Sequence, residues 1–275
     1  MSERDALYVY ALLPDRAGAA DGVTGIDGLP LRLLSVPGTG LAALVHDAPA
    51  TPYQGGDEQV RRWVDEQSRA VTLVWERTGG LLPTTFNVLV AGHAPDTGTD
   101  GDADTADGAG TAEQRLTAWV TEQAPKINEQ LAALDGRCEL RVEITLDRTA
   151  LSADDTGADA ADAAAVRSAG LRRLLAKQQE QQSRQAAERL ADALHAGLRG
   201  RLLSVADDLR DRGRTHRAPQ ETDVLCAALL VRKDEIDAVG TLLSELQAEQ
   251  PAVRIRFLGP WPPYSFAETP ETARV

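Results

Sequence analysis

The fold is decided by residues 137–146, Arg137-Cys-Glu-Leu-Arg-Val-Glu-Ile-Thr-Leu146, in which polar and apolar residues alternate with a period of two. This alternation predicts a β-strand. Further along, the pattern predicts a helical region at 163–211, a strand at 222–231, a helix at 233–249 and a strand at 253–258. The order strand, helix, strand, helix, strand predicts an α+β fold whose C-terminal domain is a modified ferredoxin-like layer with a long helical insertion.

The helical region carries leucines at steps of three and four residues, which is typical of an amphipathic helix. Gln178 and Gln182 make the middle of this stripe polar. We expect one long helix, or two with a break near Gln182-Ser183, that project from the body and pack as a hairpin or coil. The stripe is interpreted as a core or coiled-coil face. Its alternative use is a face for a partner helix, through Leu171, Leu175, Leu190 and Leu194.

The N-terminal half has its own set of strands and helices. Strands are predicted at 6–13, 31–36, 41–46 and 81–91, and helices at 57–77 and 113–134. Gly79-Gly80 marks the end of the first helix. We therefore expect two domains, an N-terminal α+β domain over 1–135 and a C-terminal domain over 136–275.

Negative charge is concentrated in two stretches. The net charge is −13, and residues 95–112 and 151–165 contain five and four Asp with no Lys or Arg. Such segments cannot bury a core, so we expect a disordered surface loop at 95–112 and an acidic loop at 151–165. Lys occurs only at positions 126, 177 and 233. An Asp-rich, Lys-poor chain suits a salt-rich cytoplasm, and the lack of a basic face argues against a nucleic-acid partner.

No motif for catalysis, cofactor binding or metal binding is recognisable in the sequence. Gly38 and Gly40 imitate a dinucleotide-binding turn, but a strand rather than a helix is predicted next. A possible calcium loop at 102–113 lacks its turn glycine. His46-Asp47 follows a predicted strand and is interpreted as a surface loop pair. The alternative is an active-site pair with a distant serine or cysteine.

The compartment follows from other features. Cys138 and Cys226 lie inside predicted strands and are interpreted as reduced core residues. No apolar run reaches the length of a membrane-spanning helix, and the first residues do not form a signal-peptide pattern. We therefore expect a cytoplasmic protein.

The most distinctive segment is the C-terminal octet Gly259-Pro-Trp-Pro-Pro-Tyr-Ser-Phe266. Its prolines favour an extended backbone, and its rings supply a large area for burial. Two interpretations are open. The octet is a C-terminal strap docked across the body, or it is a rigid patch for a partner, made of Trp261, Pro262, Pro263, Tyr264 and Phe266.

The octet also resembles the C-terminal signature of the gas vesicle accessory F/L protein family (GvpF/GvpL). Other stretches agree with that family in order: Tyr8–Leu13 with its opening strand, Leu82–Phe86 with its Leu-Pro-x-x-Phe strand, Glu139–Glu143 with its central strand, and Ala169–Leu171 with the start of its helical segment. Thr85 and Asn87 depart from the Arg and Gly usual around that Phe. The two acidic inserts point to the haloarchaeal side of the family.

The resemblance implies two α+β domains, the second a modified ferredoxin-like one. It implies a non-enzymatic role in assembling gas vesicles, the protein-walled buoyancy compartments of bacteria and archaea. The implied partners are the small hydrophobic major shell protein and other gas vesicle accessory proteins, engaged as a chaperone or a nucleation platform. Two alternatives are a self-associating minor structural component of the vesicle and an uncharacterised enzyme on a ferredoxin-like scaffold. The oligomeric state stays open.

Overall fold

The computed structural model describes residues 5–92, 110–154, 169–213 and 220–268. The chain divides into two compact units, a first unit of residues 1–137 and 261–275 and a second unit of residues 138–260. The predicted second domain included residues 261–275, whereas these residues group with the first unit. Most of the acidic loop predicted at 95–112 lies outside the described residues. Its end does not, because Thr111 caps the helix that follows.

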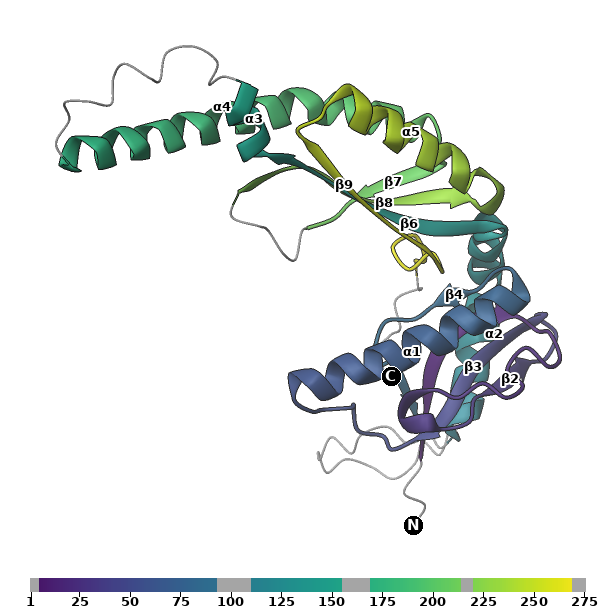
Figure 1. The fold of residues 1–275 in the computed structure, drawn as a ribbon. Helices are drawn as coiled ribbons and strands as arrows, with labels where there is room; N and C mark the ends of the chain where they lie inside the picture. The colour runs from purple at the N-terminus through teal and green to yellow at the C-terminus, as the bar shows by residue number, and fades with distance from the viewer. Residues whose placement is uncertain (1–4, 93–109, 155–168, 214–219, 269–275) are drawn as a thin grey trace, which may run out of the picture. The chain divides into compact units, whose positions relative to one another are not determined.

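The first unit is built on a five-stranded sheet with the order β2-β3-β1-β4, in which β5 also pairs with β1. The strands are β1 (Ala6–Pro14), β2 (Arg32–Val36), β3 (Leu41–Ala48), β4 (Leu82–Pro83) and β5 (Leu89–Ala91). The helices α1 (Asp57–Thr78) and α2 (Ala112–Leu134) both contact β1. Figure 1 shows α1 in front of the sheet and α2 behind it. Because both faces are covered, β1 is buried from Ala6 to Leu13 and is apolar throughout.

Both helices of the first unit begin or end at residues suited to that place. Gly79 ends α1 in the left-handed conformation, with a φ of 84°, and its N–H donates to the Trp75 carbonyl at 2.9 Å. Thr111 and Gln114 form a capping box at the start of α2. The predicted helices at 57–77 and 113–134 are thus confirmed.

The single strand predicted at 81–91 is wrong, since β4 and β5 are separated by Thr84–Val88. Asn87 has a φ of 68°, which no strand residue adopts. Its side-chain amide both accepts from the Tyr53 N–H at 2.9 Å and donates to the Tyr53 carbonyl at 3.0 Å. This distant partner bends the chain between the two short strands.

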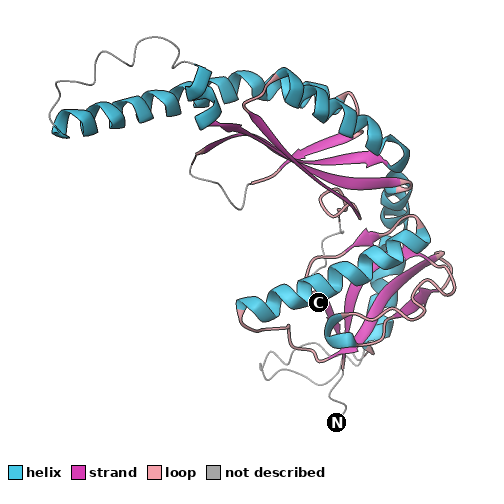
Figure 2. Cartoon of the chain, viewed as in Figure 1, coloured by secondary structure: helices cyan, strands magenta, loops and turns pink. Residues whose placement is uncertain are grey.

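The second unit is a four-stranded sheet with the order β7-β8-β6-β9. Its strands are β6 (Arg137–Asp147), β7 (Asp208–Asp211), β8 (Glu221–Arg232) and β9 (Val253–Trp261), and its helices are α3 (Arg148–Asp154), α4 (Ala169–Leu203) and α5 (Ile236–Glu249). Figure 2 shows α4 and α5 along one face of this sheet. Counting α3 and α4 as one helical layer, the element order is β-α-β-β-α-β.

Two predictions in this unit are wrong. The helix predicted over 163–211 ends at Leu203, and residues 208–211 form β7, opposite β8. Residues 151–154, predicted as loop, continue α3. The Asp147 carboxylate accepts the Thr149 N–H at 2.9 Å and so caps this helix. The remaining residues of the acidic loop lie outside the described part of the chain.

The polar side of β6 is buried as well as its apolar side. Glu139, Glu143 and Thr145 are all buried. Arg212 lies 3.3 Å from Glu139, and Arg256 lies 3.2 Å from Glu143. Buried carboxylates require such partners, because an unpaired charge away from water costs several kcal/mol, on the order of 3–5.

Candidate functional site

Most of residues 261–266, the second part of the C-terminal octet, are packed against the protein rather than exposed to solvent. Pro262, Pro263 and Phe266 are buried, and Tyr264 is half-buried. The Ala267 N–H donates to the Pro263 carbonyl at 2.9 Å, so the chain makes a compact turn here. Within the first unit, the Glu268 N–H then donates to the side chain of Gln130 on α2 at 3.0 Å. This geometry favours the strap for residues 262–266, and their role as partner contacts stays a prediction.

Gly259 is needed for the backbone geometry of the octet. It has a φ of 123°, and a Cβ at this position would lie 2.9 Å from the Glu139 carbonyl oxygen on β6. Only glycine, which has no Cβ, tolerates both this backbone conformation and this close approach to β6. The glycine of the signature is therefore explained by packing within the second unit.

Exposed apolar side chains gather on β9 just before the packed turn. Phe257, Leu258 and Trp261 are 38%, 37% and 37% exposed. β9 lies at one end of the strand order of its sheet. Of the predicted patch, Trp261 is the member that the structure leaves on the surface.

The leucine stripe on α4 is divided along the helix, which runs without a break from Ala169 to Leu203. Ala187, Ala191, Leu198 and Leu202 are buried, and Leu190 and Leu194 beside them are half-buried. The described side chains of residues 173–186 are exposed except Ser183, and Leu174 is 67% exposed. The side chains of Leu171 and Leu175 lie outside the described set. The second half of α4 therefore packs on the sheet, whereas most described side chains between residues 173 and 186 face solvent.

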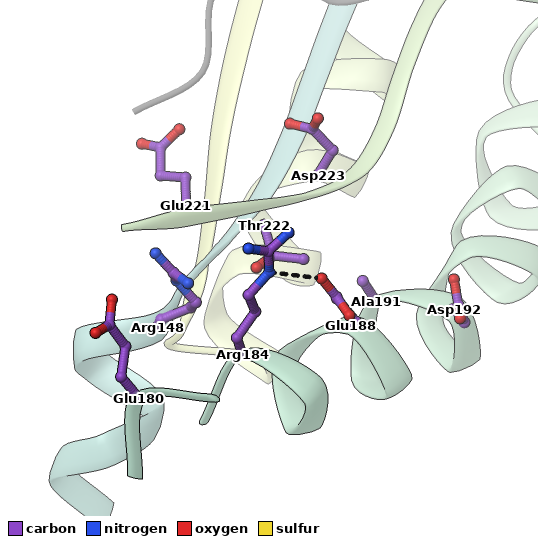
Figure 3. Close-up of a pocket in the computed structure, with 9 residues that line it drawn as sticks. All are labelled: Arg148, Glu180, Arg184, Glu188, Ala191, Asp192, Glu221, Thr222 and Asp223. Atoms are coloured by element: carbon purple, nitrogen blue, oxygen red, sulfur yellow. Dashed lines mark hydrogen bonds and ion pairs between the residues drawn. The ribbon is translucent and has the colours of Figure 1, made fainter. Parts of the chain in front are cut away.

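A charged cavity of about 370 Å³ lies between α4 and the start of β8. Figure 3 shows Arg148 and Arg184 among carboxylates from both elements. Arg184 Nε lies 3.0 Å from Glu188 Oε1. The lining holds five carboxylates: Glu180, Glu188, Asp192, Glu221 and Asp223. No serine, cysteine or histidine lines this cavity.

His46 lies in the core of the first unit, so its interpretation as part of a surface loop pair is wrong. It belongs to β3 and is buried. The Tyr10 hydroxyl accepts the Ile26 N–H at 2.9 Å, which leaves its proton for Nδ1 of His46 at 2.8 Å. Nε2 lies 3.2 Å from the Tyr53 hydroxyl. Both ring nitrogens are thus engaged in packing the core, as the neutral tautomer with its proton on Nε2 allows.

Tyr8, Tyr10, His46 and Tyr53 form an aromatic cluster in the core. The sequence showed two of its members, since the two tyrosines lie two positions apart on a predicted strand. It gave no sign of the residues that they contact. Tyr8 stacks on His46 with ring centroids 5.2 Å apart, and its hydroxyl donates to Gln67 on α1 at 2.7 Å. Burial raises the pKa of Tyr8 to about 12 and that of Tyr10 still further. Both phenols therefore act as neutral hydrogen-bonding groups near neutral pH.

Thiol chemistry at Cys138 and metal binding have little support among the described residues. Burial raises the pKa of Cys138 to about 11, so its thiol is un-ionised and unreactive near neutral pH. No group of three or more His, Cys, Asp and Glu in this part of the chain is arranged to hold a metal ion. None of the described helices is long and apolar enough to cross a membrane.

The comparison with known families covers nearly the whole chain. The model of the family described as "Gas vesicle synthesis protein GvpL/GvpF" matches residues 6–268. The chain belongs to this family. The GvpL/GvpF match includes β1 at one end and the octet at the other, two of the five segments on which the resemblance rested.

Similar proteins come from halophilic archaea. Gas vesicle protein L2 of Halobacterium salinarum is 30% identical over 278 residues, which cover 96% of this chain and 91% of that protein. Gas vesicle protein L1 of the same organism is 26% identical, over 94% of this chain and 89% of that protein. The acidic composition of this GvpL/GvpF member fits such relatives.

Solved structures show the same fold. The crystal structure of GvpF from Anabaena sp. PCC7120 superposes with a TM-score of 0.67 at 17% identity, covering 97% of each chain. That of GvpF from Microcystis aeruginosa gives 0.62 at 18% identity, over 96% of this chain and 100% of that one. At these identities the likeness concerns the fold alone.

Proposed function

We propose that this chain is a non-enzymatic assembly factor of gas vesicles, which binds the hydrophobic major shell protein and other accessory proteins as a chaperone or nucleation platform. The observation that carries the proposal is membership of the GvpL/GvpF family over residues 6–268. The vesicle-associated, cytoplasmic location is part of the same proposal.

The fold supports this proposal through its exposed surfaces. A shell protein with apolar helix and strand surfaces would aggregate before assembly. A soluble chain with a net charge of −13 resists association with itself. If it bound the apolar surface of the shell protein transiently, the shell protein would stay available for ordered growth. Trp261 in the first unit and the half-buried Leu190 and Leu194 in the second unit are each proposed as partner contacts.

The architecture is also proposed in finer terms. The β-α-β-β-α-β order and the strand order β7-β8-β6-β9 support a ferredoxin-like second domain enlarged by α3 and α4. We propose residues 136–260 as the limits of this domain, because the chain from Trp261 onward groups with the first unit.

Affinity purification from a gas-vesicle-producing cell, at high salt, tests the proposal. We expect the shell protein and other gas vesicle proteins to be captured by the full chain. An unrelated soluble protein of similar net charge is the control, and it should capture neither. Equal capture by both would overturn the proposal, because charge and composition alone would then explain the association.

One observation favours a second function, that of a self-associating structural component. The described side chains of residues 173–186 on α4 are exposed except Ser183, and Leu174 is 67% exposed. A helix exposed in this way suits pairing with a second helix. The mass of the purified chain in high salt, with and without shell protein, separates the two. A stable oligomer without shell protein supports self-association.

A further inference from the structure

The outer edge of β9 carries both charged side chains and exposed apolar side chains. β9 pairs with β6 at the end of the strand order, so half of its backbone N–H and C=O groups point away from the sheet. Proteins commonly protect such an edge with charges, prolines or a covering segment. Over residues 253–258 the two charges are arginines, and they are followed by Phe257 and Leu258, both more than one-third exposed.

The side chains of β9 divide into two rows. Arg254, Arg256 and Leu258 lie on one face because side chains two apart share a face. Arg254 lies 3.1 Å from Asp147, and Arg256 lies 3.2 Å from Glu143. The side chains of both arginines remain about half or more exposed, at 48% and 64%. Each can therefore accept a second carboxylate from outside the sheet.

A second copy of this chain is a poor occupant for that edge. Two copies of β9 would pair antiparallel about a two-fold axis, with facing residues on the same side of the sheet. If the axis passes through Ile255, Arg254 faces Arg256 of the other copy. If it passes through Arg254 or Arg256, that arginine faces itself. Like charges directly opposite one another destabilise a strand pair.

A register centred on Phe257 avoids the facing arginines but has another cost. It brings Pro260 opposite Arg254 of the other copy, and proline has no N–H to donate. The edge at residues 253–258 is thus open to a strand, yet poorly matched to itself.

We propose that the outer edge of β9, residues 253–258, binds an extended segment of the hydrophobic partner protein by adding it to the sheet as a fifth strand. The segment would carry apolar side chains opposite Phe257 and Leu258 and an Asp or Glu opposite Arg254 or Arg256. Backbone hydrogen bonds to the added strand provide the affinity, and contacts with the two rows of side chains determine which segment binds. This inference rests on the proposed function and names the surface that performs it.

Substitution at the edge is the first test, with the full chain co-expressed with shell protein and purified at high salt. Phe257→Lys removes the ring and places a charge in the other row of β9, opposite to that of Arg254 and Arg256. We expect it to weaken binding of the shell protein by about tenfold. Phe257→Leu should retain binding. Leu73→Lys makes the same kind of change at a 38% exposed site on α1 and should have no effect.

Amide hydrogen exchange provides a readout that a loss of folding cannot imitate. In the complex, the outward amides of residues 253–258 should exchange more slowly than in the free chain, because they become paired. Binding of shell protein with unchanged exchange in β9 would overturn this inference and leave the proposed function standing. Failure of the unmodified chain to bind any shell protein would overturn both. Slowed exchange in β9 of the free chain, together with a doubled mass, would overturn the choice of occupant.

Discussion

β1 and β9 are both strands of nine residues, and both contain aromatic side chains, yet they lie in opposite surroundings. β1 is hydrogen-bonded to three strands, and its tyrosine hydroxyls are bonded to core residues. β9 lies at a sheet edge with Phe257 and Leu258 partly exposed. The comparison teaches that the position of a strand in its sheet, rather than its composition, decides whether its apolar area stabilises the fold or is available to a partner.

The largest expected effect is a cavity in β1. Leu12 is 1% exposed, and Leu12→Ala should lower the free energy of unfolding by about 2–5 kcal/mol, because the transfer energy of the side chain is lost and a void is left. Urea unfolding at high salt measures the change. Leu12→Met conserves volume and should cost less than about 1.5 kcal/mol. A loss below about 1 kcal/mol for Leu12→Ala would show that β1 is not the tightly packed centre described above.

The next effect concerns the polar part of β1. Tyr10→Phe keeps the ring but removes the hydroxyl that accepts the Ile26 N–H and serves Nδ1 of His46. Leaving buried polar groups without partners should cost about 1–3 kcal/mol of unfolding free energy. Tyr53→Phe is the control, since Tyr53 is only half-buried and its hydroxyl lies farther from His46, at 3.2 Å. Equal losses for both variants would contradict the central role of Tyr10.

The contrast between these strands also shows how far sequence reasoning reaches. β1 and β6 were predicted because an apolar run and a period-two alternation are local patterns. β7 was missed because Val205 and Leu209 continue the three- and four-residue spacing of the leucines in α4. What ends the helix is the turn in which the Ser204 hydroxyl donates to the Arg201 carbonyl, and what makes residues 208–211 a strand is their pairing with β8.

The candidate site was predicted only in part for the same reason. The octet was recognised as distinctive from its composition, and its place in the GvpL/GvpF family followed. The sequence could not separate the buried Phe266 from the exposed Trp261, because this depends on a turn that packs in the first unit. Nor could it show that Phe257 and Leu258 lie at an edge, since the strand order of a sheet is set by pairings between distant segments.

A smaller effect on stability is expected at alkaline pH. Burial raises the pKa of Tyr8 to about 12 in the folded chain, against about 10 in the unfolded chain. The neutral phenol is thus favoured by folding, and its contribution is complete below pH 10 and is lost as pH rises toward 12. At pH 11 the loss from Tyr8 is about 1.4 kcal/mol. Tyr8→Phe should flatten the fall in unfolding free energy between pH 9 and pH 11, and an unchanged slope would contradict this assignment.

The smallest expected effect is on β9 and completes the comparison. Leu258→Ala makes the same chemical change as Leu12→Ala, but at a side chain that is already 37% exposed at a sheet edge. It should change the unfolding free energy by less than about 1 kcal/mol, because little of the side chain is removed from water and no enclosed void forms. Its effect should instead appear in the binding of shell protein. Leu258→Ala could instead destabilise the chain as much as Leu12→Ala and leave binding unchanged. β9 would then be a second core strand, and its exposed side chains Phe257 and Leu258 would have no role in binding a partner.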